Sequence, residues 1–173
     1  MSMYPIASYT VGAGGATNIS FASIPQTFTH LQIRMFAANA GAADFSVYFN
    51  SDTATNYVQH NLYGDGSSAA TYFYGTGANS ITFAFPFQGI VSSTSFASVV
   101  MDVLDYTNTN KNKTTRAIGG IDRNGSGLVA LESGLWRSTA AVSSINVSLT
   151  AGTFVQYSRF DLYGIQTSNA TGA

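Results

Sequence analysis

The chain has 173 residues, a length that suits one domain, since domains of roughly 100–200 residues are typical. Only 9% of the residues are charged and the net charge is −1, which excludes a strong field toward nucleic acid or an anionic membrane. The chain has no Cys, so disulfides are excluded as well. A content of 45% hydrophobic residues, with 12 Phe and 10 Tyr, argues against disorder. We therefore expect a folded domain whose partners are neither nucleic acid nor membrane.

The residues left to cover the surface are mostly small and neutral: 21 Ser, 19 Thr, 12 Asn and 17 Gly. Two interpretations remain open. One is a well-packed domain with a neutral polar surface that contacts only water. The other is that much of the surface contacts other protein, because interfaces are depleted of charge and enriched in aromatic residues. We favour the second interpretation.

The N-terminal residues carry no sign of a targeting segment. Residues 1–11 lack a basic start and a long apolar run, and Pro5 and Gly12 interrupt the pattern. No window approaches the roughly 18 apolar residues that a membrane span needs. We expect a soluble protein that stays in the compartment of its synthesis, with a short N-terminal arm over residues 1–15.

Alternation of apolar and polar residues with a period of two dominates the chain and predicts β-strands. In the first clear run, Leu31, Ile33 and Met35 share one face. Pro86 lies within a later run and indicates an edge strand or a bulge. No stretch shows a convincing helical period. In chain order, the predicted strands cover residues 28–36, 45–49, 81–87, 95–106, 117–121, 128–131, 144–149 and 154–165.

Short segments rich in Gly and Asn separate these runs and predict turns. Asn124-Gly125 lies between two predicted strands and is typical of a two-residue hairpin turn. Residues 64–66 and 75–77, each with two Gly, predict further turns. Residues 166–173 are short and polar, and we expect a flexible C-terminal tail there.

These elements predict one all-β domain over residues 1–165. Eight to ten antiparallel strands in a single open sheet would curl or split into two. We therefore expect a two-sheet antiparallel sandwich, and a jelly roll is the arrangement that suits it best. The chain shows no internal repeat of the kind that builds a propeller or a solenoid.

The sequence holds no motif that we assign to catalysis, to a cofactor or to a metal. No Gly-x-Ser-x-Gly elbow is present, and two His without Cys leave a zinc site short of ligands. Glu132 is the only Glu, and nothing in the sequence pairs it with a second carboxylate. A glycan hydrolase that uses Glu132 is therefore the least favoured function, and we do not expect an enzyme.

Two groups of residues are candidates for an interface. The only local basic cluster consists of Lys111, Lys113, Arg116 and Arg123. Such a cluster marks a solvated loop more often than a site, but it could meet an acidic protein neighbour, and Lys111, Lys113 and Arg116 are the candidates for that contact. Trp136, followed by Arg137, is either a core aromatic, an interface anchor or a platform for sugar stacking. Trp and Arg lead among the residues that dominate binding energy.

Two segments, Ile24–Arg34 and Ser158–Ile165, resemble those of a family of small virion proteins of tailed bacteriophages. In that family, a comparable first strand and a closing Phe-x-Leu-Tyr-Gly-Ile strand bracket a jelly-roll domain. The resemblance spans about residues 19–165 and transfers no catalytic residue. It implies a homotrimer, in the role of a capsid decoration (cement) protein or of the head of a fibre or tail appendage.

Between these roles, we expect a trimeric capsid decoration protein. The first strand begins close to the N-terminus, without the rod or attachment segment that a fibre head normally needs. Such a protein is made in the host cytoplasm and binds the major capsid protein on the virion surface. The alternative is a tail-fibre or baseplate module that binds a host surface glycan.

Overall fold

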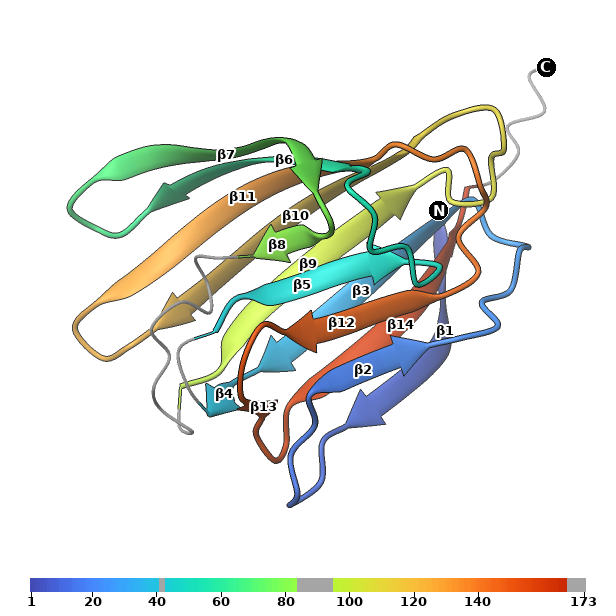
Figure 1. Ribbon diagram of the computed structural model, residues 1–173. Helices are drawn as coiled ribbons and strands as arrows, with labels where there is room; N and C mark the ends of the chain where they lie inside the picture. The colour runs from blue at the N-terminus through green and yellow to red at the C-terminus, as the bar shows by residue number, and fades with distance from the viewer. Residues whose placement is uncertain (41–42, 84–94, 168–173) are drawn as a thin grey trace.

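The computed structural model describes residues 1–40, 43–83 and 95–167 (Figure 1). Every regular element in these residues is a strand, and every strand pairing is antiparallel. The described part of the chain has no helix long and apolar enough to cross a membrane. The all-β prediction is confirmed. The strands are β1 (Ser2–Thr10), β2 (Asn18–Phe21), β3 (His30–Ala37), β4 (Asn39–Ala40), β5 (Phe45–Phe49), β6 (Tyr57–Gly64), β7 (Ala69–Ala78), β8 (Ile81–Phe83), β9 (Ala97–Leu104), β10 (Lys113–Asp122), β11 (Gly127–Trp136), β12 (Ile145–Leu149), β13 (Thr153–Phe154) and β14 (Arg159–Gln166).

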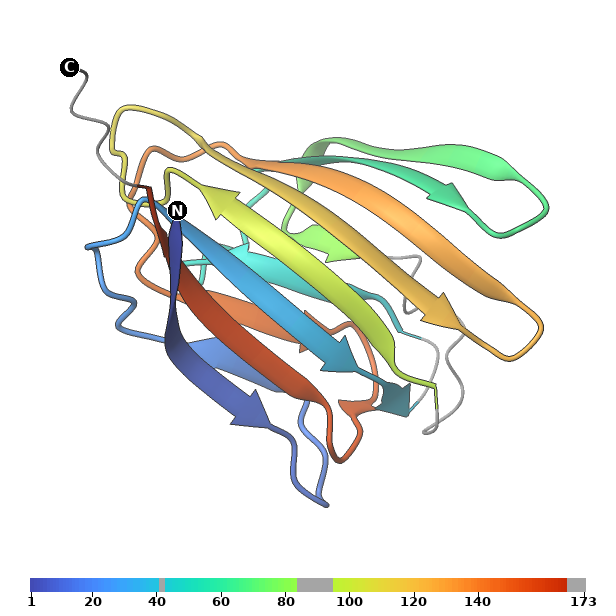
Figure 2. The same cartoon turned by 180° about the vertical axis from the view of Figure 1, so that it is seen from behind.

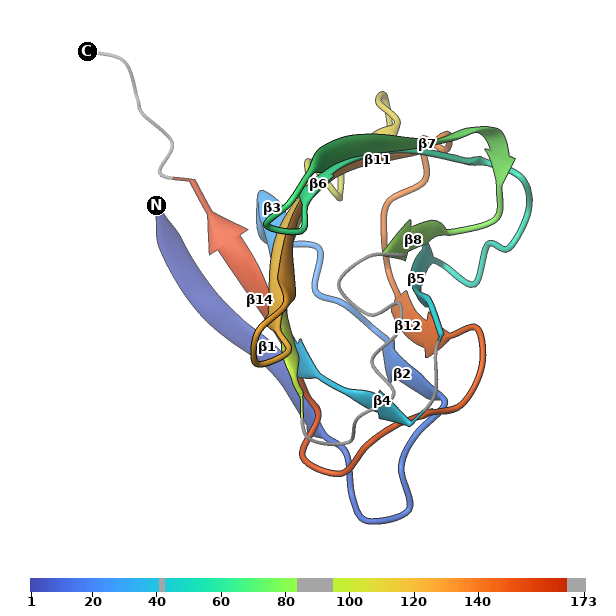
Figure 3. The ribbon, with the colours of Figure 1, turned by 90° about the vertical axis from the view of Figure 1, so that its left-hand side faces the viewer.

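The strands form two packed layers, as predicted (Figure 3). The large sheet has the order β1-β14-β3-β9-β10-β11-β6-β7, and the small sheet has the order β2-β12-β5-β8. A separate pair, β13-β4, completes the fold. The fourteen strands of the described residues exceed the eight to ten predicted. β4 and β13 are too short to show alternation, and β1, β2, β6 and β7 were not among the predicted ranges.

The chain follows a jelly-roll path. It crosses from one sheet to the other at every step except within the β6–β7 hairpin and the β9–β10–β11 meander, and two of the crossings pass through β4 and β13. Each crossing places consecutive strands on opposite sides of one core, where both bury an apolar face. The meander and the β14–β1 pair make the large sheet twice as wide as the small one.

The core lies between the two sheets and confirms the alternation expected for β3. Leu31, Ile33 and Met35 are buried there, and Phe45 and Val47 of β5 are buried in the same cluster from the opposite sheet. Burying a side chain of this size stabilises the fold by roughly 1.5–3 kcal/mol relative to leaving it exposed. The inner face of the large sheet is the one toward this core, and the outer face is the opposite one.

Residues 2–10 form an edge strand of the large sheet, which corrects the arm expected over residues 1–15. β1 pairs with β14 along its whole length, with Tyr9 opposite Phe160. The register shifts just after Pro5, and this irregularity lets the strand continue past a residue that cannot donate to the ladder. Proline in the sequence pattern is the reason why the strand was not predicted.

The hairpin predicted at Asn124-Gly125 is confirmed and joins β10 to β11. Asn124 has a φ of 55° and Gly125 a φ of 104°, positive values that a tight hairpin turn requires. The turn predicted at residues 75–77 is wrong, because these residues lie within β7. Gly77, with a φ of 124°, stands where the register between β6 and β7 shifts, so it permits a bulge and not a turn.

Two predictions fall partly outside the described residues. The strand predicted over residues 81–87 is seen as β8, whereas residues 84–87, with Pro86, lie outside the description. The flexible tail predicted over residues 166–173 is corrected at its start, because Gln166 is the last residue of β14. Residues 168–173 lie outside the described chain.

Candidate functional site

The outer face of the large sheet is the one toward the viewer in Figure 2, and it carries a row of mostly apolar side chains. Val100 of β9 lies opposite Ile118 of β10, which lies opposite Leu131 of β11. Leu131 lies opposite Leu62 of β6, and Leu62 lies opposite Thr71 of β7. Directly opposed residues on neighbouring strands have their Cβ atoms about 5 Å apart. These five residues therefore form one continuous row across five strands, and all of them except Thr71 are apolar.

Most of this row is open to solvent. The relative exposure is 49% for Leu62, 53% for Ile118 and 51% for Leu131. Phe73 of β7 and Val129 of β11, on the same face, are also exposed. Single exposed apolar residues are normal, whereas a contiguous group of them marks a surface that binds something. We name Leu62, Phe73, Ile118, Val129 and Leu131 the outer-face patch.

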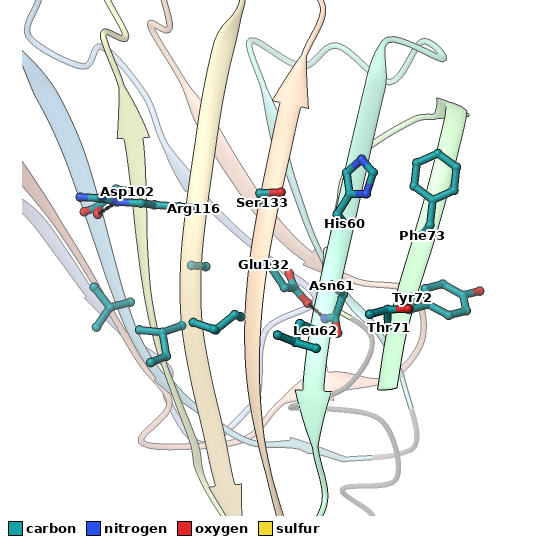
Figure 4. Close-up of a pocket in the computed structure, with 14 residues that line it drawn as sticks. His60, Asn61, Leu62, Thr71, Tyr72, Phe73, Asp102, Arg116, Glu132 and Ser133 are labelled. Atoms are coloured by element: carbon teal, nitrogen blue, oxygen red, sulfur yellow. Dashed lines mark hydrogen bonds and ion pairs between the residues drawn. The ribbon is translucent and has the colours of Figure 1, made fainter. Parts of the chain in front are cut away.

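A second row, which is mostly polar, runs beside the apolar row (Figure 4). It consists of Asp102, Arg116, Ser133, His60 and Phe73, each opposite the next. Arg116 Nε donates to Asp102 Oδ2 at 2.9 Å. The His60 ring packs on the Phe73 ring, with centroids 4.7 Å apart. The row thus offers an ion pair, a hydroxyl group and a pair of packed rings.

An open groove of about 780 Å³ lies between the two rows. Its lining includes Ala117, Glu132 and Asn61, which alternate with the residues of the rows. Because alternate side chains point to opposite faces, these three contribute backbone to the floor. The groove spans five strands, or about 19 Å at the usual strand spacing. It can take an extended or flat partner, with apolar contact along one wall and hydrogen bonds along the other.

A hydrogen-bonded network continues the polar row toward β3. Gln32 Nε2 donates to Asp102 Oδ1 at 2.8 Å, and Arg34 Nε donates to Gln32 Oε1 at 2.9 Å. The Arg34 guanidinium carbon lies 5.3 Å from the centre of the Tyr163 ring. These groups satisfy one another, so the β3 side of the outer face is mostly polar, with the exposed Phe36 as its apolar exception. The apolar character is concentrated on β6, β7, β10 and β11.

Glu132 lies under the groove, on the inner face of β11. Its Oε1 accepts a hydrogen bond from Asn61 Nδ2 at 2.6 Å, and both side chains are buried. Burial raises the pKa of Glu132 to about 8, against the opposing effect of the hydrogen bond from Asn61. Glu132 Oε2 and Asn61 Oδ1 have no hydrogen-bond partner among the described residues. A protonated carboxyl group avoids a buried charge and turns one oxygen of Glu132 into a donor.

Trp136, predicted as an interface anchor or a sugar platform, is instead a core residue with 2% exposure. Its Nε1 donates to Asp52 Oδ2 at 2.7 Å. Its ring centroid lies 5.6 Å from that of Phe49 and 6.4 Å from that of Tyr57. Trp136 falls on the inner face of β11, where the small sheet covers it, so the core alternative is the correct one.

Lys113, predicted in the basic cluster, is fully buried and is not an interface residue in this fold. Its Nζ donates to three backbone carbonyls, those of Asn108 at 2.6 Å, Lys111 at 2.8 Å and Thr139 at 3.1 Å. An ammonium group has three donors, and here each has an acceptor. Lys113 therefore joins the β9–β10 loop to the β11–β12 connection.

The other three predicted interface residues are exposed. Lys111 Nζ lies 3.6 Å from Asp105 Oδ2, and Arg137 Nη2 donates to the carbonyl of Thr55 at 2.8 Å. Of the three, only Arg116 lines the groove. The basic cluster is thus divided, because alternation along β10 sends Arg116 outward and Lys113 inward.

The outer-face patch was missed in the sequence because its members lie on four strands. A signal was nevertheless present in residues 128–131, four consecutive apolar residues. A strand with one face in water alternates, so an unbroken run indicates that both faces meet apolar surroundings. Ile118, next to Ala117, gives the same signal in β10.

Among the described residues, no three His, Cys, Asp or Glu side chains gather as a metal site would require. The two His are well separated, since β9, β10 and β11 lie between β3 and β6. His30 Nδ1 accepts a hydrogen bond from the backbone N–H of Asp105 at 2.9 Å. His60 lines the groove.

Comparisons of the chain with protein-family models, with curated proteins and with solved structures find no match. Function is therefore inferred from the outer face itself and from the sequence.

Proposed function

We propose that this chain is a protein-binding structural subunit of a larger assembly and, within that class, a trimeric decoration protein of a phage capsid. The observation that carries the proposal is the outer-face patch. Leu62, Ile118 and Leu131 are about half exposed and lie directly opposite one another on neighbouring strands. Exposing this apolar surface to water is unfavourable. A protein partner would bury them, and the low charge of the chain leaves few ionic groups to desolvate.

The two segments that resemble phage virion proteins are neighbours in the fold, which supports the virion role. Ile24–Arg34 leads into β3, and Ser158–Ile165 covers β14 except for its last residue, with Ile33 opposite Leu162. A jelly roll closed by this pair is what the resemblance implies. A decoration protein binds the assembled lattice and not the free capsid subunit, so it would stabilise the shell by mass action.

A host-glycan-binding module of a tail fibre or baseplate is the second candidate function. The polar wall of the groove favours it, because Asp102, Arg116 and Ser133 offer hydrogen bonds beside the ring of Phe73. Ligand sites combine an apolar lining with a few placed polar groups in this way. The aliphatic wall formed by Ile118 and Leu131 suits protein better than sugar, and for this reason we rank the glycan second.

Quantitative mass spectrometry of purified particles of the encoding virus tests the proposal. We expect a copy number close to that of the major capsid protein, because a decoration protein follows the lattice. A handful of copies per particle would exclude the decoration role and support the tail module. Complete absence from particles would contradict both.

Two binding assays with the purified chain separate the candidates independently. Co-sedimentation with capsids stripped of decoration is expected for a decoration protein. Retention on host polysaccharide coupled to beads is expected for the glycan binder. Arg116→Gln removes the guanidinium from the polar wall and should weaken the second interaction more than the first, which depends mainly on the apolar wall.

A further inference from the structure

A second, smaller hollow lies on the outer face of the large sheet, where β14, β3 and β9 run side by side (Figure 2). Its volume is about 290 Å³, just below the roughly 300–1,000 Å³ of sites for drug-sized ligands, so it suits a single ring. Arg159 lies opposite Phe36, and Phe36 lies opposite Ser98. We name the hollow the Phe36 hollow; its outward-pointing residues are Arg34, Phe36, Ser98, Val100, Arg159 and Asp161.

Phe36 gives the hollow an aromatic face. It is the only large apolar residue of these three strands that is exposed, at 53%. Its ring stacks on that of Phe96, with centroids 4.9 Å apart and an angle of 10° between the rings. The stack orients Phe36 before a ligand arrives, which lowers the entropy cost of binding. Because the face of an aromatic ring is electron-rich, it attracts the slightly positive C–H groups on the face of a sugar ring.

Arg159 supplies free hydrogen-bond donors beside this ring. Its Nε donates to Asp161 Oδ1 at 3.0 Å and to Oδ2 at 2.9 Å, and Ser8 Oγ donates to the same Oδ1 at 2.6 Å. These bonds hold the guanidinium through Nε alone. The described residues accept no hydrogen bond from its two Nη atoms, and the side chain is 58% exposed. A planar guanidinium with free donors is the group that binds a carboxylate through two parallel hydrogen bonds.

The charges around the hollow are complementary to an anion. Arg34 and Arg159 carry two positive charges against the single negative charge of Asp161, so one positive charge is in excess. Asp102, on the same face, does not cancel this excess, because it is paired with Arg116 at 2.9 Å. The whole chain has a net charge of −1. The positive charge is therefore a local feature of this hollow.

We propose that the Phe36 hollow binds an acidic sugar, that is, a pyranose ring that carries a carboxylate. The sugar ring lies on Phe36, and its carboxylate accepts hydrogen bonds from the Nη atoms of Arg159. Asp161 and Ser98 remain for the sugar hydroxyls. The inference goes beyond the proposed decoration role and rests neither on that role nor on the outer-face patch.

The combination of groups selects this ligand class over two simpler ones. An inorganic anion such as phosphate would use Arg159 but leave the ring of Phe36 in water. A neutral sugar would use Phe36 but leave the excess positive charge unpaired. Only a ligand that has both a ring and an anionic group uses both. The groove beside the outer-face patch differs from this hollow, because Ile118 and Leu131 give it an aliphatic wall.

Titration of the ¹⁵N-labelled full chain with glucuronate, followed by NMR, tests the proposal. We expect saturable shifts of the amide signals of Phe36, Ser98 and Arg159, with a dissociation constant of about 1 mM, which is usual for one ring with few contacts. Glucose and inorganic phosphate each lack one half of the ligand. Each should therefore bind at least about tenfold more weakly than glucuronate.

Substitutions separate the two contacts. Phe36→Ala removes the aromatic face and should weaken glucuronate binding about tenfold, whereas Phe36→Tyr keeps the ring and should bind like the wild type. Arg159→Gln should lower the affinity for glucuronate to that for glucose. Arg137→Gln, at an exposed arginine outside the hollow and the groove, is the matched control and should not change binding. Thermal unfolding confirms that each variant is folded.

Three results would overturn the proposal. One is the absence of saturable shifts at a glucuronate concentration about 50 times the expected dissociation constant. Another is equal affinity of the wild type for glucuronate and glucose. The third is a set of shifts centred on Ile118 and Leu131, which would place the sugar in the groove and support the glycan-binding module.

These outcomes are separate from the fate of the decoration role. The copy number in particles is measured without reference to sugar binding, so loss of the Phe36 site would leave that role standing. Conversely, a chain that is absent from particles but binds glucuronate at Phe36 would contradict the virion role and retain the sugar site.

Discussion

The two halves of the large sheet distribute polar and apolar side chains in opposite ways. On β3 and β9, apolar residues such as Ile33 and Met101 are buried, and polar residues such as Gln32 and Asp102 face outward. On β6, β10 and β11, aliphatic residues of the outer-face patch are exposed while several polar residues are buried. The buried polar residues of these three strands are Gln59, Asn61, Lys113, Thr115 and Glu132.

The half of the sheet formed by β6, β10 and β11 is stable because most of its buried polar groups have hydrogen-bond partners. Gln59 Nε2 donates to the Thr82 carbonyl at 2.6 Å, and Gln59 Oε1 accepts from the Thr82 N–H. Lys113 makes three hydrogen bonds of the same kind. A buried polar group costs little once it is paired. The comparison teaches that the inner face of this half tolerates paired polar residues beside aliphatic ones such as Ile121, while its outer face carries aliphatic residues that are suited to contact with something other than water.

Truncation of an isoleucine to alanine in each half of the sheet should give the largest difference in the free energy of unfolding. Ile33→Ala removes a fully buried side chain and should lower the free energy of unfolding by about 2–5 kcal/mol. Ile118→Ala removes a half-exposed one and should cost less than about 1 kcal/mol. Urea unfolding at a concentration low enough to separate copies measures both. Equal losses of unfolding free energy would show that Ile118 is buried within a single copy, which would contradict its place in the exposed outer-face patch.

Glu132, in the half of the sheet with buried polar residues, should make the stability of the protein depend on pH. The folded state holds the proton up to a pKa of about 8, whereas the ordinary pKa is 4.5. The contribution of Glu132 is therefore full below about pH 4.5 and is lost as the pH rises toward 8, by an amount on the order of a few kcal/mol. Urea unfolding across this range measures the decline.

Glu132→Gln is the matched control for this pH effect, because the amide is nearly isosteric and does not ionise. The difference in unfolding free energy between Glu132→Gln and the wild type should grow in favour of the variant between pH 5 and pH 8. Parallel pH profiles for the two proteins would show that Glu132 is not the titrating group.

Removing the charge of Lys113 should give a smaller loss. Lys113→Met keeps the length of the side chain but leaves three backbone carbonyls without their donor, at a cost of about 1–3 kcal/mol. Lys111→Met, at an exposed neighbour, should cost less than about 0.5 kcal/mol. Thermal unfolding of the Lys113→Met and Lys111→Met variants measures both losses. If Lys113 were a surface lysine, as expected from the sequence, the two variants would lose the same small amount of stability.

Much of the fold was predictable because alternation reports local geometry. The strand at β3, the hairpin at Asn124-Gly125 and the two-sheet jelly roll follow from period-two patterns and turn residues. β1 escaped prediction because Pro5 interrupts its pattern, and only pairing with β14 shows that the strand continues. The residues of β7 near Gly77 have turn chemistry but lie in a strand, because the β6 neighbour holds them there.

The candidate site was less predictable than the fold. Lys113 looks like a surface residue by type, and the type of Trp136 suits a core, an interface or a sugar platform. Both lie on the inner face and make their polar contacts inside the molecule. Residue type indicates what a side chain can do but not whether it is covered. Arg116 is the one predicted interface residue that the structure places in the groove.

By itself, the sequence determined that the chain forms strands and which residues of each strand share a face, because successive side chains on any strand point to opposite sides. Only the tertiary structure decided which of the two faces is covered and which residues meet across strands. Ile118 and Leu131 come together through a hairpin, but Leu62 joins them only because β6 pairs with β11, far along the chain. The outer-face patch is a product of that pairing, since strand register is set by contacts between distant segments and not by any one of them.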